Sequence, residues 1–335
     1  MALSTDVQGR GAAARPSIDA GPQLAGGVKL KRNSELAVGI ALGSGVARGW
    51  AHIGVLNALE RVGIKPDIVC GTSIGALIGG VYVAGRLEGL EAWARRLNRL
   101  RVTRLLDFQI GHGGLIAGRR IMQVFDEELH GLTIENLPLP FACVSTDLET
   151  GHEVWLQQGN LMDAVRASYA LPGVFPAVKL DGRWLIDGAL VNPIPVSMCR
   201  ALGAHLVIAV DVNADTFGTA RLRAVREIEA ADERAIVRRI RNLPGAELAR
   251  QLFSHRSDEP SMLNVMARSL QIVQDRVSRS RLASDPPDVT IIPRLGAIGV
   301  LQFDRASEII RAGEEAVERA IPHLEEALER LDSRR

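Results

Sequence analysis

Apolar residues in this chain alternate between short continuous runs and longer stretches with helical spacing. Runs typical of buried strands occupy residues 36–42, 67–70, 141–145, 153–156, 183–186, 206–212 and 289–292. Helical spacing predicts helices at residues 50–62, 90–101, 119–130, 161–169 and 304–330. Because strands and helices alternate, we expect an α/β fold with a largely parallel central sheet.

Changes in composition divide the chain into four segments. Residues 1–34 are rich in Ala, Gly, Pro and Ser without periodicity, which predicts a flexible tail. The alternating pattern of the core spans residues 35–213. Residues 214–285 are rich in Arg and Glu and are predicted to form a helical insertion or cap. Residues 286–335 return to a strand and a long helix that complete the core, and Pro322 must kink or restart this helix.

The sequence Gly71-Thr72-Ser73-Ile74-Gly75 lies between a buried strand and a helix of small residues. This G-x-S-x-G pattern in that context is typical of a nucleophile elbow. The two glycines permit a strained turn that exposes the Ser73 hydroxyl near the positive end of the helix. The N–H of Ile74 can then face a developing oxyanion. A glycine-rich turn with an incidental serine is the alternative interpretation of these five residues.

The glycine-rich loop at residues 43–49 has two interpretations. Its position between a strand and a helix suits dinucleotide binding, but its spacing is G-x-G-x-x-x-G. The second strand also lacks a ribose-binding acid at its end. A nest of backbone N–H groups that holds an anion is the better interpretation, and beside Ser73 that anion would be a tetrahedral oxyanion. Arg48 either braces this loop or assists the anion.

Ser73 needs a general base, and the chain offers histidines and aspartates. Three histidines follow Asp187, as a Ser-Asp-His order requires, but only one strand precedes the elbow strand, which is a poor topology for such a triad. We expect His52 to pack against the glycine-rich loop. The histidines after Asp187 are His205, His255 and His323.

An aspartate can also act as the base directly. Asp181 precedes a glycine in a predicted hairpin turn, and Asp147 begins a loop where an Asx-turn is expected. Asp187 follows a strand and Asp211 lies at the C-terminal end of one, where functional residues concentrate. From the residues alone these two candidates are about equal.

The composition of the chain argues against several classes of function. The chain has 335 residues with 47% hydrophobic and 24% charged residues, and a net charge of +1, so it has no general attraction for nucleic acid. Cys70, Cys143 and Cys199 are far apart, which argues against a disulfide framework or zinc site and fits a reducing compartment. The N-terminus lacks an apolar leader and no run is long enough to span a membrane. We therefore expect a cytoplasmic protein.

Three motifs in order resemble the patatin-like phospholipase family, in its bacterial branch similar to the neuropathy target esterase catalytic domain. They are residues 43–49, residues 71–75 and Asp187-Gly188-Ala189. The resemblance implies a three-layer α/β sandwich, ester hydrolysis on lipids by a Ser73–Asp187 dyad, and no metal or organic cofactor. It places the oxyanion hole at Gly43, Ser44, Gly45, Val46, Arg48, Gly49 and Ile74.

The loop departs from the family's run of consecutive glycines at Ser44 and Val46. A β-branched side chain disfavours positive φ, so the departure leaves open a catalytically weak member with a lipid-binding or regulatory role. The expected partner is a lipid or acyl ester, met by transient contact with the inner membrane surface. Residues 216–284 are predicted to form a helical cap near Ser73, with packing on the sheet edge as the alternative.

Overall fold

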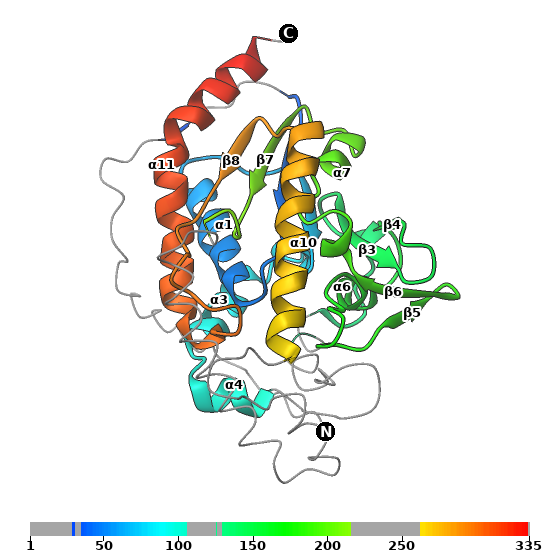
Figure 1. The fold of residues 1–335 in the computed structure, drawn as a ribbon. Coiled ribbons are helices and arrows are strands. Elements are labelled where there is room, and N and C mark those ends of the chain that lie inside the picture. The colour runs from blue at the N-terminus through cyan, green and yellow to red at the C-terminus, as the bar shows by residue number, and fades with distance from the viewer. Residues whose placement is uncertain (1–28, 31–34, 106–124, 126–128, 216–261, 334–335) are drawn as a thin grey trace, which may run out of the picture.

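The computed structural model describes residues 29–30, 35–105, 125, 129–215 and 262–333, which form an α/β fold around one sheet (Figure 1). The predicted mostly parallel central sheet is confirmed. The strands are β1 Val38–Leu42, β2 Ile68–Thr72, β3 Phe141–Asp147, β4 Glu153–Leu156, β5 Val178–Leu180, β6 Arg183–Asp187, β7 Leu206–Val210 and β8 Val289–Ile291.

The sheet is parallel at its centre and antiparallel at one side. Its order is β5-β6-β3-β2-β1-β7-β8, and β4 also pairs with β3. Parallel pairing joins β3, β2, β1, β7 and β8, whereas β4 and β6 run antiparallel to β3. Every residue of β1, β2, β3 and β7 is buried. Strands covered on both faces have continuous apolar sequences, so these four strands could be predicted from the sequence.

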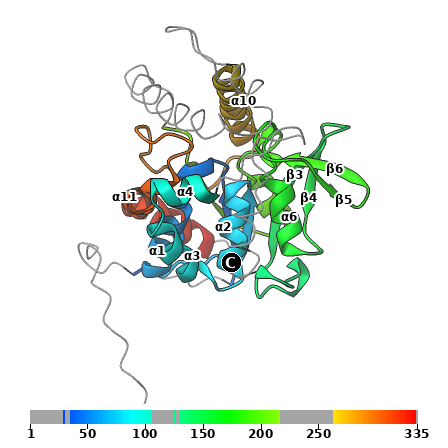
Figure 2. The same ribbon diagram turned by 90° about the horizontal axis from the view of Figure 1, so that it is seen from below.

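Helices cover both faces of this sheet (Figures 1 and 2). One core contains Ile40 and Leu42 of β1 with residues of α1, α2 and α11, and the other contains Ala41 with residues of α7. Leu282 of α10 packs against this second core. The helices are η1 Val46–Trp50, α1 Ala51–Arg61, α2 Ile74–Val83, α3 Leu87–Arg95, α4 Arg99–Leu105, η2 Ile134–Asn136, α6 Leu161–Ser168, η3 Gly188–Leu190, α7 Val196–Ala201, α10 Met262–Ser284, η4 Phe303–Arg305 and α11 Ala306–Asp332.

One predicted helix is divided in the structure, and another is continuous through its proline. Residues 90–101 were expected to form one helix, but α3 ends at Arg95 and α4 begins at Arg99. The side chain of Asn98 accepts the N–H of Arg101, an N-terminal cap that starts a new helix. The last helix does not restart at Pro322, because α11 continues through it. Figure 1 shows α11 changing direction toward its C-terminal end.

Parts of three predictions lie outside the described residues. They include most of the predicted tail, most of the helix at residues 119–130, and residues 216–261 of the predicted cap. Leu30, which was assigned to the tail, is buried in the core and donates its N–H to Val62 O at 2.7 Å. None of the helices in the described ranges has the length and apolar content needed to cross a membrane.

Candidate active site

Ser73 occupies a strained turn between β2 and α2. Its φ is 58° and its ψ is −121°, a conformation that costs about 1 to 3 kcal/mol in a residue with a side chain. A Cβ on Gly71 would collide with the backbone of Ala76, and one on Gly75 would collide with the carbonyl of Leu42. Only glycine therefore lets the strand and helix approach closely enough to form this turn.

The hydroxyl of Ser73 donates to Asp187, with Oγ 2.7 Å from Oδ2. Sheet register brings the two residues together. Thr72 at the end of β2 lies opposite Val144, and Asp187 at the end of β6 lies opposite the next residue, Ser145. Two strands that are far apart in sequence thus end at neighbouring residues of β3.

Asp187 is 1% exposed and held on several sides. Its Oδ1 accepts the N–H of Ala189 at 2.8 Å, and its own N–H donates to Ala170 O at 3.0 Å. Thr146 Oγ1 donates to the Asp187 carbonyl at 2.8 Å. Burial raises the pKa of Asp187 to about 7, although the hydrogen bonds from Ala189 and Ser73 partly oppose this. The carboxyl group is thus oriented toward Ser73 and is unusually basic.

Each of the other candidate aspartates lies in a local turn. Asp147 Oδ1 accepts the N–H groups of Glu149 and Thr150, which is the expected Asx-turn. Asp181 adopts a φ of 47° in the turn between β5 and β6, the expected hairpin. Asp211 Oδ1 accepts the N–H groups of Asn213 and Ala214. Among these four aspartates, Asp187 is the one that contacts Ser73.

Among the described residues, no candidate histidine is hydrogen-bonded to Ser73. His52 is fully buried, and its Nε2 donates to Gly43 O at 2.7 Å, so it packs against the loop as expected. Burial lowers the pKa of His52 to about 4. His205 is exposed at the start of β7, and His323 is exposed on α11. His255 lies outside the described residues.

The first part of the glycine-rich loop is anchored through its amides. The N–H of Gly43 donates to Val210 O at 3.1 Å, and the N–H of Ser44 donates to Pro193 O at 3.0 Å. These two amides are therefore occupied. Within the described residues, no acceptor is bound by the N–H groups of Gly45, Val46 or Ile74.

Val46 takes a φ of 52° although its side chain is β-branched. Such a conformation is an outlier that the surrounding structure must hold in place. Arg48 is 2% exposed and braces the loop, because its Nε donates to Ile298 O at 3.0 Å. A Cβ on Gly49 would collide with Ile74, so this glycine lets η1 pack against the start of α2. The interrupted glycine run thus still adopts a left-handed backbone at Val46.

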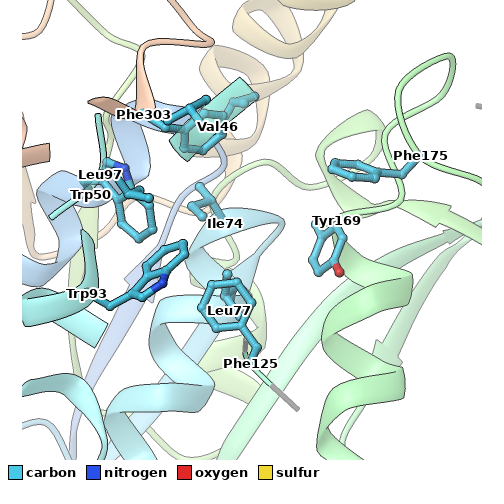
Figure 3. A pocket seen from close by; sticks show the side chains of 11 residues that line it. Val46, Trp50, Ile74, Leu77, Trp93, Leu97, Phe125, Tyr169, Phe175 and Phe303 are labelled. Atoms are coloured by element: carbon cyan, nitrogen blue, oxygen red, sulfur yellow. The ribbon is translucent and has the colours of Figure 1, made fainter. Parts of the chain in front are cut away.

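An apolar cavity of about 90 Å³ lies beside the elbow. Figure 3 shows Ile74 and Leu77 between aromatic side chains from η1, α3 and η4 on one side and Tyr169 and Phe175 on the other. Residues near Ser73 and near the glycine-rich loop both contribute to its wall. The lining residues are Val46, Trp50, Ile74, Leu77, Trp93, Leu97, Val102, Phe125, Tyr169, Phe175 and Phe303.

Comparison with known proteins places this geometry in a family. The model of the patatin-like phospholipase family matches residues 40–200, a range that includes Ser73 and Asp187. An uncharacterized NTE family protein of Mycobacterium tuberculosis is 32% identical over 343 residues, covering 89% of this chain and 95% of that protein. The chain belongs to the patatin-like phospholipase family. The resemblance inferred from the three motifs is thus confirmed, and membership implies lipid acyl-hydrolase activity.

Other proteins that resemble this patatin-like chain match it over a shorter range or with a lower identity. Patatin-like phospholipase domain-containing protein 6 of mouse is 36% identical over 186 residues, which cover 52% of this chain and 13% of the mouse protein. The crystal structure of VipD from Legionella pneumophila aligns with a TM-score of 0.44 and 12% identity, over 94% of this chain and 72% of that chain. The second likeness is too slight to support a functional argument.

Sequence reasoning missed one polar residue beneath the nucleophile of this patatin-like chain. The N–H of Ser73 donates to Ser168 Oγ at 2.9 Å, and Ser168 Oγ donates to Val144 O at 2.6 Å. Ser168 ends α6, which lies 95 residues from Ser73 along the chain. No local spacing connects the two serines. Besides the three motifs, residues 167–176 also resemble the family, and this was the one available signal for Ser168.

Proposed function

We propose that this protein hydrolyses acyl esters of lipids, such as phospholipids or lysophospholipids, through a Ser73–Asp187 dyad. The observation that carries the proposal is the 2.7 Å hydrogen bond between Ser73 Oγ and Asp187 Oδ2 at a strained elbow. Family membership supports the class of substrate. A buried carboxylate within hydrogen-bond reach of a serine can replace the usual histidine as the base.

In the first half-reaction Ser73 Oγ attacks the acyl carbonyl carbon, and its proton passes to Asp187 Oδ2. The carbonyl oxygen becomes an oxyanion, and the N–H groups of Gly45, Val46 and Ile74 are assigned to stabilise it. When the intermediate collapses, the ester C–O bond breaks. The leaving alkoxide then takes the proton from Asp187, so an alcohol departs and an acyl-serine remains.

In the second half-reaction water replaces the alcohol. Asp187 removes a proton from this water while the oxygen attacks the acyl-serine carbonyl carbon. Collapse of the second intermediate breaks the bond to Ser73 Oγ, which recovers its proton from Asp187. The products are a fatty acid and the original serine. A pKa near 7 suits both roles, because Asp187 must accept and return a proton at neutral pH.

The segments of the chain contribute unequally to this site. We propose that residues 35–213 and 286–335 form one catalytic unit, supported by the pairing of β7 with β8 and the packing of α11 on α1. The cysteines Cys70, Cys143 and Cys199 are buried and unpaired, which fits the proposed cytoplasmic location. Substrate lipids reside in membranes, so transient contact with the inner membrane surface is part of the proposal.

A fluorophosphonate probe tests the dyad directly. The probe should add once to the wild-type protein, and peptide mapping should place the adduct on Ser73. Ser73→Ala should remain unlabelled, whereas Ser284→Ala, which changes an exposed serine of α10, should react like the wild type. Labelling that persists in Ser73→Ala would overturn the proposal.

A further inference from the structure

The apolar cavity begins beside the nucleophile. Ile74 follows Ser73 directly, and Val46 belongs to the glycine-rich loop, yet both side chains line the cavity. An ester whose carbonyl oxygen reached the amides of these two residues would therefore have its acyl chain next to the cavity. Figure 3 shows Ile74 at its centre, with Trp50 and Trp93 on one side.

Aromatic residues concentrate at this cavity. Six of the chain's thirteen aromatic residues (four Trp, two Tyr and seven Phe) line it, although aromatic residues make up only 4% of the chain. Trp50 packs edge-to-face against Trp93 and against Phe303, with ring centroids 6.1 Å apart in each pair. Close-packed rings hold one another in place, so this wall cannot swell easily to admit a longer chain.

The volume of the cavity sets a limit on what it can hold. An apolar cavity of roughly 150 Å³ accommodates benzene, which has six carbon atoms. By the same proportion, the 90 Å³ found here has room for about four carbon atoms. The carbonyl carbon and the carbon beside it would lie at Ser73, outside the cavity. An acyl group of about four to six carbons would therefore fill it, and further methylenes would remain outside.

We propose that this cavity binds the first carbons of the acyl chain and that Trp93 sets the chain-length limit. The inference rests on the proposed ester hydrolysis at Ser73. Trp93 lies on α3, a surface helix, and is half-buried between the cavity and solvent. Trp50, in contrast, is 2% exposed within the main core. Removing the indole of Trp93 would extend the cavity outward, whereas removing that of Trp50 would damage the core.

The test measures kcat/KM for p-nitrophenyl esters from acetate to octanoate, each below its critical micelle concentration. Every methylene that enters an apolar pocket should raise kcat/KM roughly fourfold. In the wild type we expect this rise to stop at about four to six carbons. A rise that continues at the same slope to octanoate would overturn the proposed limit.

In Trp93→Ala, kcat/KM should continue to rise to longer acyl chains than in the wild type. The ratio of kcat/KM for octanoate to that for butyrate should increase by about tenfold. Trp184→Ala is the matched control, because Trp184 is 42% exposed on β6 and does not line the cavity. An unchanged ratio in a folded Trp93→Ala protein would overturn the role of Trp93. Ester hydrolysis that is absent at every chain length, or that survives Ser73→Ala, would overturn the proposed function and this inference with it.

Discussion

Arg281 of α10 forms an ion pair with Glu153 of β4, with Nη2 2.8 Å from Oε2. The Nε of the same arginine donates to Val191 O at 3.0 Å, in the segment that follows Asp187. Glu153 Oε1 in turn accepts from Asn192 Nδ2 at 2.8 Å, and Asn192 O accepts the hydroxyl of Thr72. A helix outside residues 40–200 thus connects to the neighbours of both dyad residues.

Arg281→Met should lower kcat and the rate of fluorophosphonate labelling by about tenfold while KM changes little, because the loop after Asp187 loses a charged hydrogen-bond donor. The Arg281 side chain is 38% exposed, so the midpoint of thermal unfolding should move only slightly. Arg279→Met is the control, since Arg279 pairs with Asp275 on its own helix. Labelling of Arg281→Met at the wild-type rate would show that this network does not position the dyad.

Asp187→Asn should lower kcat by at least about a hundredfold, the low end for losing a general base. Asparagine can still bond both Ser73 and the N–H of Ala189, so circular dichroism should report an intact fold. Asp211→Asn should stay near wild-type activity because Asp211 accepts from its own turn and, among the described residues, makes no hydrogen bond to Ser73. The dyad assignment fails if Asp211→Asn is the more damaging change.

The same Asp187→Asn variant should be more stable than the wild type at high pH. Burial raises the pKa of Asp187 in the folded protein to about 7, above the usual value of 3.8. The folded state therefore holds this proton more tightly, and its contribution to stability is present below pH 3.8 and lost as the pH rises through 7. Urea unfolding should show the variant's advantage growing by about 4 kcal/mol between pH 4 and pH 8. An advantage that does not change with pH contradicts the raised pKa.

The pH profile of activity should have an acidic limb set by Asp187. The base must be deprotonated, so kcat/KM should rise tenfold per pH unit up to about 7 and then level off. At pH 5 this leaves roughly one hundredth of the plateau value. A limb near pH 4 would indicate an Asp187 with an ordinary pKa.

His52 should support the loop without acting as a base. His52→Ala removes one buried hydrogen bond to Gly43 O and should cost about tenfold in kcat. His52→Gln can restore this bond and much of the activity. Changes at the exposed His205 and His323 should have little effect, and a thousandfold loss in a folded His205→Ala protein would indicate a conventional triad.

Local signals explain which parts of the site could be predicted. Ser73 was identified because the two glycines of its turn and the flanking strand and helix are adjacent in sequence. Asp187 and Asp211 could not be separated from the residues alone, because both lie at the C-terminal ends of strands. Only sheet register, which places Asp187 opposite Ser145, distinguishes them. The family resemblance supplied that assignment in place of the missing register.

The boundary between α3 and α4 is a feature of the fold that the sequence pattern also does not reveal. Apolar spacing continues through residues 90–101, but Asn98 caps a new helix there and Leu97 is 7% exposed against the core. A capping asparagine and an exposed asparagine look alike in a periodic pattern. Ser168 could not be found for a related reason, since its partner Ser73 is distant in sequence.

Val46 belongs to two parts of the site at once. Its backbone holds a left-handed turn in the glycine-rich loop, and its side chain forms part of the cavity wall. Glycine at this position would relax the turn but would also enlarge the cavity. A substitution of Val46 would therefore change both the rate of hydrolysis and the preference for acyl-chain length. Neither natural selection nor design can alter one without the other at this position.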